Sequence, residues 1–189
     1  MIDATTEARL VAALRGGDVQ ARDAAIAELH ERSARPLFQL CLRVACDAAD
    51  ADDAVQETFV DVLRGIGSFR GDAKLSTWLF RIAIRAATRV RNKTARRRHD
   101  VTDADANAVA GSDDPVARAA ERENAQRLLA AIDQLPAAQR AVVGLAAIQG
   151  IEHAEIAAVL GIPVGTVGSR LHEARDRLRV LLAARRPNP

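Results

Sequence analysis

The segment that follows Pro163 carries side chains of the types that read a DNA duplex. Arginine can bind guanine in the major groove, glutamate can accept a hydrogen bond from cytosine, and hydroxyl groups suit phosphates. A helix that begins at Val164 would place five such side chains on its outer side: Thr166, Ser169, Arg170, His172 and Glu173. The chemistry of this set is recognition of nucleic acid.

The residues around this segment predict a helix-turn-helix. Gly161 can adopt the positive φ that ends one helix, and Pro163 suits the start of the next. Spacings of three and four then give an inward seam at Val167, Leu171, Ala174, Leu178 and Leu181. A helix-turn-helix inserts the first part of its second helix into the major groove. The alternative is a plain helical hairpin whose arginines face solvent.

A second group of cations lies on a helix predicted over residues 75–98. Arg81, Arg85 and Arg89 recur every four residues on one side, after a loop with two glycines. Such a loop and helix could hold an unstacked base and the phosphates of a single strand. Trp78 could stack on that base, but we favour a place in the core for the single tryptophan of an aromatic-poor chain. The run of basic residues after Val90 can also be a solvated face.

An acidic face precedes this basic helix. Asp50 is the predicted N-cap of a helix in which Asp53, Gln56 and Glu57 fall at i, i+3 and i+4. This face is either solvated or a docking surface for a basic helix of a partner.

The composition favours an all-α protein with two domains. Aromatic residues make up 3% of the 189 residues and tyrosine is absent, so Leu, Ile, Val and Ala must build the core. Residues 99–116 lack an apolar period and are rich in Asp, Ala and Gly, which predicts a flexible acidic linker. We therefore expect two helical domains, residues 1–98 and residues 117–189, the second with the helix-turn-helix.

Charge is distributed in blocks along the chain. The net charge of +2 combines −5 over residues 1–60, +8 over 61–100, −4 over 101–135 and +3 over 136–189. Two basic blocks predict a polyanionic partner that is contacted at two places.

Other classes of protein find little support. Cys41 and Cys46 lack metal-ligand spacing, and no phosphate loop or nucleophile motif is present, so we expect no cofactor, no metal and no catalytic residues. The N-terminus lacks a signal peptide, and the longest uncharged stretch, residues 156–169, is too short for a bilayer. We expect a cytoplasmic protein without membrane insertion.

Two long stretches resemble the modules of bacterial RNA polymerase sigma factors, specifically the extracytoplasmic-function (ECF) group. They read DADDAVQETFVDVLRGIGSFRGDAKLSTWLFRIAIRAATRVRN and GIEHAEIAAVLGIPVGTVGSRLHEARDRLR. The likeness covers about residues 12–98 and 117–182, in the family's order. It implies a protein without catalysis of its own that binds core RNA polymerase, through the β and β′ subunits, and promoter DNA.

The resemblance also implies roles for individual residues. Asp53, Gln56 and Glu57 match the motif that docks on the β′ subunit. The second module would read the −35 element as duplex, through the five side chains after Pro163. The first would recognise and open the −10 element, with these candidates: Lys74, Thr77, Arg81, Arg85 and Arg89.

The family comparison adds a partner and two departures. Family members are commonly inhibited by an anti-sigma factor, so we expect such a partner. Gly168 and Glu173 stand where family members often have basic residues, which predicts a modest affinity for an unusual −35 sequence. The alternative function is a stand-alone helix-turn-helix regulator that binds duplex DNA without polymerase.

Overall fold

A computed structural model describes residues 3–100, 115–148 and 150–184, and every regular element within them is helical. This confirms the predicted fold class. The elements are α1 (Ala4–Arg15), α2 (Val19–Ala45), α3 (Ala48–Gly65), the 3₁₀ turn η1 (Ile66–Ser68), α4 (Leu75–Asp100), α5 (Pro115–Asp133), α6 (Ala137–Ala146), α7 (His153–Leu160) and α8 (Val164–Ala184). The predicted linker falls mostly on residues 101–114, outside the described residues.

Helices α1 to α4 form a bundle whose core consists of small aliphatic side chains. Leu29 and Leu40 of α2, Val62 of α3 and Ala83 of α4 are fully buried. Along α4, Leu75, Leu79, Ala83, Ala86 and Val90 are buried in this core, and Ile82 is half-buried. Because alanine occupies several contact positions, α3 and α4 can approach closely along their length.

The start of α3 differs from the prediction. Asp47, not Asp50, is the N-cap, and its side chain accepts a hydrogen bond from the Asp50 backbone N–H at 3.0 Å. Cys46 ends α2 in the left-handed region at φ 62°. Helix α3 therefore begins at Ala48, before the predicted cap at Asp50. Asp50 is buried, and its carboxylate accepts a 2.7 Å hydrogen bond from the Thr94 hydroxyl of α4.

Helices α6 to α8 form the predicted helix-turn-helix region. Gly161 ends α7 with φ 65° and ψ 37°, and α7 and α8 meet at a bend of 99°. The apolar seam of α8 is buried only in its first half: Val167, Leu171 and Ala174 are buried, whereas Leu178 and Leu181 are half-buried. Within the described residues no single helix is long and apolar enough to cross a membrane, although the bent pair α7 and α8 meets that criterion of length and composition together.

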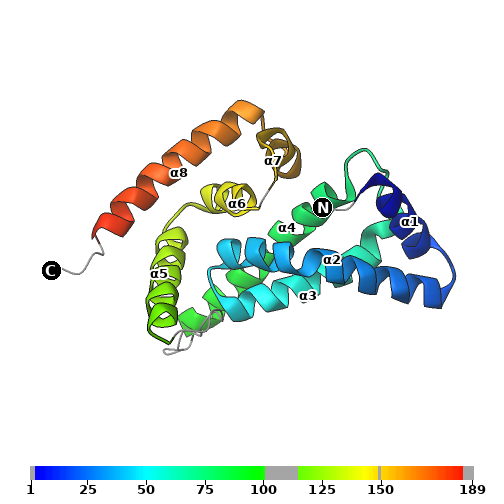
Figure 1. Ribbon diagram of the computed structural model, residues 1–189, viewed down its shortest axis with the longest axis horizontal. Helices are drawn as coiled ribbons and strands as arrows, with labels where there is room; N and C mark the ends of the chain where they lie inside the picture. The colour runs from blue at the N-terminus through cyan, green and yellow to red at the C-terminus, as the bar shows by residue number, and fades with distance from the viewer. Residues whose placement is uncertain (1–2, 101–114, 149, 185–189) are drawn as a thin grey trace.

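The helix-turn-helix region packs against the N-terminal bundle. Helix α6 contacts α2, α7 contacts α4, and α8 lies on the outer side of both (Figure 1). Gly144 of α6 permits this contact, because a Cβ atom there would lie 3.0 Å from Leu40 Cδ1. Near the C-terminal end of α2, Arg91 of α4 forms a 2.6 Å ion pair with Asp133 at the end of α5. Helix α8 contributes Val167 and Leu171 to the shared core and turns its polar side to solvent.

Candidate nucleic-acid and polymerase interfaces

The first half of α8 presents its polar residues to solvent. Ser169, His172 and Glu173 are exposed, and Thr166 and Arg170 are half-buried at the edge of the seam. Their spacing results from helix geometry: Thr166, Arg170 and Glu173 follow one another at i, i+4 and i+7, so they share a face. All five predicted residues therefore lie on the accessible side of α8.

A second carboxylate lies on the same helix and was missed in the sequence. Asp176 forms an ion pair with Arg179 at 2.7 Å, and His172 Nε2 lies 3.3 Å from Asp176 Oδ2. These contacts bring an acidic group next to predicted DNA contacts, and they hold His172 and Arg179 along the helix. The spacing of four residues after His172 was the available signal.

Glu173 does not stand free on this surface. Gln139 of α6 donates a hydrogen bond from Nε2 to Glu173 Oε2 at 3.0 Å. The Gln139 side chain is 5% exposed, in contrast to Glu173. Sequence reasoning did not identify Gln139, because nothing local to α6 shows that its amide reaches another helix.

The cations of α4 fall into different environments. Arg81, Arg85 and Arg89 are exposed, as the periodicity predicts, and Lys74 lies exposed just before the helix. Thr77 is only 3% exposed, so it has no surface for direct contact with DNA in this arrangement. Thr77 lies in the first turn of α4, where its buried side chain has a structural role.

Arg89 links the basic and acidic surfaces. Its guanidinium donates to Asp61 at 2.8 Å and to Glu57 at 2.9 Å. These hydrogen bonds, first with Asp61 and then with Glu57, raise the pKa of Arg89 above its ordinary value. A predicted DNA contact on α4 and a predicted polymerase contact on α3 are therefore neighbours in one ion-pair network.

Two other cations of this surface contact the helix-turn-helix region. The Arg81 guanidinium donates to the carbonyl oxygens of Ala158 and Val159 at the end of α7. Lys74 Nζ lies 3.7 Å from Glu155 Oε2, and the Ser76 hydroxyl donates to Glu155 Oε1 at 3.3 Å. Arg85, by contrast, has no ion-pair partner among the described residues, so its charge is directly available.

Trp78 packs as a core residue. It is half-buried, lies against the hydrophobic core, and its ring centroid is 5.3 Å from that of Phe69. A Cβ atom at Gly65 would lie 3.4 Å from the Trp78 ring. The side chain thus fixes the loop between α3 and α4, in agreement with the core interpretation.

The acidic face of α3 is accessible and extends further than predicted. Asp53 and Gln56 are exposed, and Glu57 is half-buried beside Arg89. Val60 continues the same face one turn later and is 44% exposed, although the residue is apolar. The exposed face of α3 thus combines a carboxylate, an amide and one apolar side chain.

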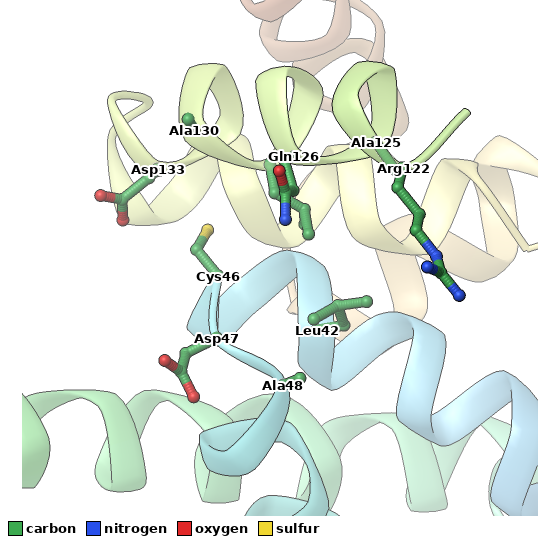
Figure 2. Close-up of a pocket in the computed structure, with 10 residues that line it drawn as sticks. Leu42, Cys46, Asp47, Ala48, Arg122, Ala125, Gln126, Ala130 and Asp133 are labelled. Carbon is green, nitrogen blue, oxygen red and sulfur yellow. The ribbon is translucent and has the colours of Figure 1, made fainter. Parts of the chain in front are cut away.

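A pocket lies between α5 and the junction of α2 and α3 (Figure 2). The Cys46 side chain points toward α5, where Gln126 and Asp133 also line the space. Burial raises the pKa of the Cys46 thiol to about 11, so it is protonated and a weak nucleophile at neutral pH. Asp133 is already paired with Arg91, and no group of potential metal ligands occurs among the described residues.

Comparison with known families identifies both halves of the chain. Residues 29–97 match the model of Sigma-70 region 2, and residues 125–178 match that of Sigma-70, region 4. The first match contains the acidic face and most of the basic helix, and the second contains the helix-turn-helix.

Individual relatives match along nearly the whole chain. The ECF RNA polymerase sigma factor SigM of Mycobacterium tuberculosis is 39% identical over 179 residues, which cover 94% of this chain and 85% of the relative. The RNA polymerase sigma-H factor of Pseudomonas aeruginosa is 32% identical over 188 residues, which cover 94% of each.

Solved structures of sigma factors match the fold of this chain. CnrH in complex with the cytosolic domain of CnrY matches with a TM-score of 0.66 and 28% identity, over 96% of this chain and 99% of that one. The sigma factor RpoE of Bartonella quintana, in complex with the anti-sigma factor NepR, matches in fold with a TM-score of 0.60 and 24% identity, over 84% of this chain and 99% of that one. With two sigma modules in order and relatives along its length, this chain belongs to the ECF group of RNA polymerase sigma factors, and it directs promoter-specific transcription.

Proposed function

We propose that this sigma factor binds core polymerase, opens the −10 element and reads the −35 element through three separate surfaces on its two modules. The observation that carries the proposal is the separation of exposed cations: one group lies on α4, and another lies on the outer side of α8. Residues 1–98 bind core polymerase and open the −10 element, and residues 117–189 read the −35 element.

Binding to core polymerase uses the exposed face of α3. Asp53, Gln56 and Glu57 provide carboxylates and an amide for a basic helix of the β′ subunit, and Val60 adds an apolar contact beside them. Charge complementarity speeds the encounter, and the apolar side chain adds affinity once water is excluded.

Opening of the −10 element uses the cations of the α4 surface. Arg85 is the principal candidate, because it is exposed and unpaired among the described residues. Lys74, Arg81 and Arg89 join it when their present ion pairs and hydrogen bonds are exchanged for phosphates. Thr77 is buried, so we assign it to the structure of the helix start. Free energy from these contacts offsets the cost of unstacking promoter bases.

The second module reads the −35 duplex with the five polar side chains of α8. Arg170 can bind guanine, Ser169 and Thr166 suit phosphates, and His172 and Glu173 lie further along the same side. In this proposal the polymerase supplies the chemistry of transcription, and the chain acts by binding in the cytoplasm, where polymerase and DNA are located.

An anti-sigma factor is the expected regulatory partner. The solved relatives support this: RpoE of Bartonella quintana is described in complex with an anti-sigma factor, and CnrH in complex with a cytosolic domain of CnrY. A stand-alone regulator is not favoured, because such a protein has no need of the acidic surface on α3.

Run-off transcription with core polymerase tests the three assignments. Asp53→Lys should abolish co-elution with core polymerase in gel filtration. Arg85→Glu should lower strand opening, and Arg170→Glu should lower promoter binding, each by about tenfold or more. Arg32→Glu is a matched charge reversal on α2, outside all three surfaces, and should transcribe normally. Full transcription by both Arg85→Glu and Arg170→Glu would refute the assignment of the −10 and −35 elements to α4 and α8.

A further inference from the structure

A buried amide holds the one carboxylate among the predicted −35 contacts. Gln139 lies in the first turn of α6, 5% exposed, and its Nε2 donates to Glu173 Oε2 on α8 at 3.0 Å. Glu173 is itself exposed, so this bond fixes the orientation of a side chain that would otherwise rotate in solvent. The other carboxylate oxygen, Oε1, keeps no partner among the described residues.

Packing alone does not explain why a glutamine occupies this position. The neighbouring buried residues of α6 are mostly apolar, including Ala141, Val142 and Leu145. The Oε1 atom of Gln139 is buried and has no hydrogen-bond partner in the described part of the chain, which is unfavourable for a polar group. A methionine of similar size would fill the space without that cost, so the hydrogen bond to Glu173 is the property that the glutamine adds.

The position of Glu173 determines what its free oxygen can meet. It shares a face with Thr166 and Arg170, and together they project from the side of α8 that enters the groove in the proposed function. A carboxylate there is repelled by the phosphates on both edges of the groove. It is compatible with the duplex where it accepts a hydrogen bond from a base amino group, and in the major groove cytosine N4 and adenine N6 provide such donors.

We propose that Gln139 is a positioning residue for −35 specificity, and that the Glu173 carboxylate it orients selects an amino-bearing base, with cytosine as the preferred one. Cytosine is preferred because it presents its amino group without the adjacent N7 acceptor of adenine, which would repel a carboxylate. This inference rests on the proposed function, in which α8 reads the −35 duplex. It assigns base selection to a pair of residues on two different helices.

Selection of promoters from a library tests the inference. Holoenzyme assembled from core polymerase and the full chain is given templates randomised over the −35 element, and transcribed templates are sequenced. The wild-type protein should enrich a C·G pair at one position by about tenfold. Glu173→Ala should remove that preference, and Glu173→Gln should shift it toward adenine, because an amide can both donate to N7 and accept from N6.

To distinguish positioning by Gln139 from a structural effect, base preference is measured at each −35 position together with the melting temperature. Gln139→Met should reduce the preference at that one position several-fold, with preferences elsewhere and the melting temperature nearly unchanged. Glu173→Asp is a second variant on an exposed site; it keeps the charge but shortens the side chain away from Gln139, and should reduce the preference similarly. Gln134→Met is the control, since Gln134 is an exposed glutamine of the same module whose side chain, among the described residues, bonds only to the Ala130 carbonyl.

Three results overturn the inference. Glu173→Ala that improves transcription equally from all templates would mean that Glu173 only repels phosphates. Gln139→Met that lowers transcription equally from all templates would mean that Gln139 only supports packing, and an unchanged preference in Glu173→Asp would show that orientation is irrelevant. A wild-type holoenzyme with no −35 base preference at all would instead refute the proposed function.

Discussion

At the scale of single residues, burial controls the chemistry of the two thiols. Cys41 is fully buried, and desolvation raises its pKa to about 12 from an ordinary value of 9.0. Cys46 is half-buried, and its pKa rises to about 11 for the same principal reason. Both thiols are protonated near neutral pH, so they act as packing residues. This agrees with the sequence, in which their spacing does not match a metal site.

The Cys41 shift predicts that stability falls in alkaline solution. The folded pKa is raised, so the stabilising contribution is present below pH 9 and is lost as pH rises from about 9 toward 12, where the unfolded thiol ionises first. Between pH 8 and pH 10 the loss from this thiol should be about 1 kcal/mol. The chain has no tyrosine, but the Cys46 thiol, with its pKa raised to about 11, should add a loss of similar size in the same interval.

Urea unfolding at pH 8, 9 and 10 measures this loss. Cys41→Ala is the control; it is less stable overall, but its free energy of unfolding should decline less steeply across the interval. Equal slopes for the two proteins would show that the Cys41 thiol does not contribute.

Among the elements, α8 shows how far sequence patterns reach. Gly161 and Pro163 located the turn before it, and spacings of three and four located Val167 and Leu171 in the core. The same spacing continues through Leu178 and Leu181, which are only half-buried, because a periodic pattern does not indicate where the neighbouring helix ends. The start of α3 was misplaced for a related reason: the left-handed conformation of Cys46 has no sequence signal.

A glycine in α8 permits a gain of function. A Cβ atom at Gly168 would meet no atom within 4 Å, so the site has room for a side chain. Gly168→Arg should raise the free energy of unfolding by about 0.5–1 kcal/mol through helix propensity. It should also strengthen promoter binding and steepen the dependence of log affinity on log salt by about 0.9, as expected for one added phosphate contact.

Thermal unfolding and salt titrations of holoenzyme on a promoter fragment check both effects. Gly168→Ala separates them, since it supplies the propensity without the charge. A salt dependence that is the same in the Arg and Ala variants would exclude a phosphate contact at this position.

For the whole molecule, the contacts between modules were beyond sequence reasoning. Arg81 was placed correctly on the exposed side of α4, but its hydrogen bonds run to Ala158 and Val159 at the end of α7. Gly144 and Leu40 meet although a hundred residues separate them, and neither carries a local signal of that contact. The helical pattern of each module could be predicted from the sequence. The arrangement of the modules could not, because it depends on how their surfaces fit together in three dimensions.

The contacts between the modules use side chains that the proposed function assigns to promoter binding. Arg81 and Lys74 contact α7 in the free chain, so in the proposed function these contacts are exchanged for contacts with DNA when α7 moves away from α4. The Lys74–Glu155 pair is exposed on the lysine side and contributes little by itself, about 0–1 kcal/mol. The apolar contact of α6 with α2 should therefore be the larger part of the docking free energy.

Gly144→Val should separate the modules of the free chain. Its Cβ atom would lie 3.0 Å from Leu40 Cδ1 and 3.6 Å from the Leu40 carbonyl oxygen. The two γ-methyl groups of valine reach further than this Cβ atom, so we expect α6 to be displaced from α2. We expect a larger radius of gyration in small-angle X-ray scattering, with little change in helix content by circular dichroism. Gly165→Val is the matched control, because a Cβ atom at Gly165 meets no atom within 4 Å, and it should leave the radius unchanged. If both variants scatter like the wild-type protein, the close approach at Gly144 does not hold the modules together, and release of Arg81 to DNA would need no separation at this contact.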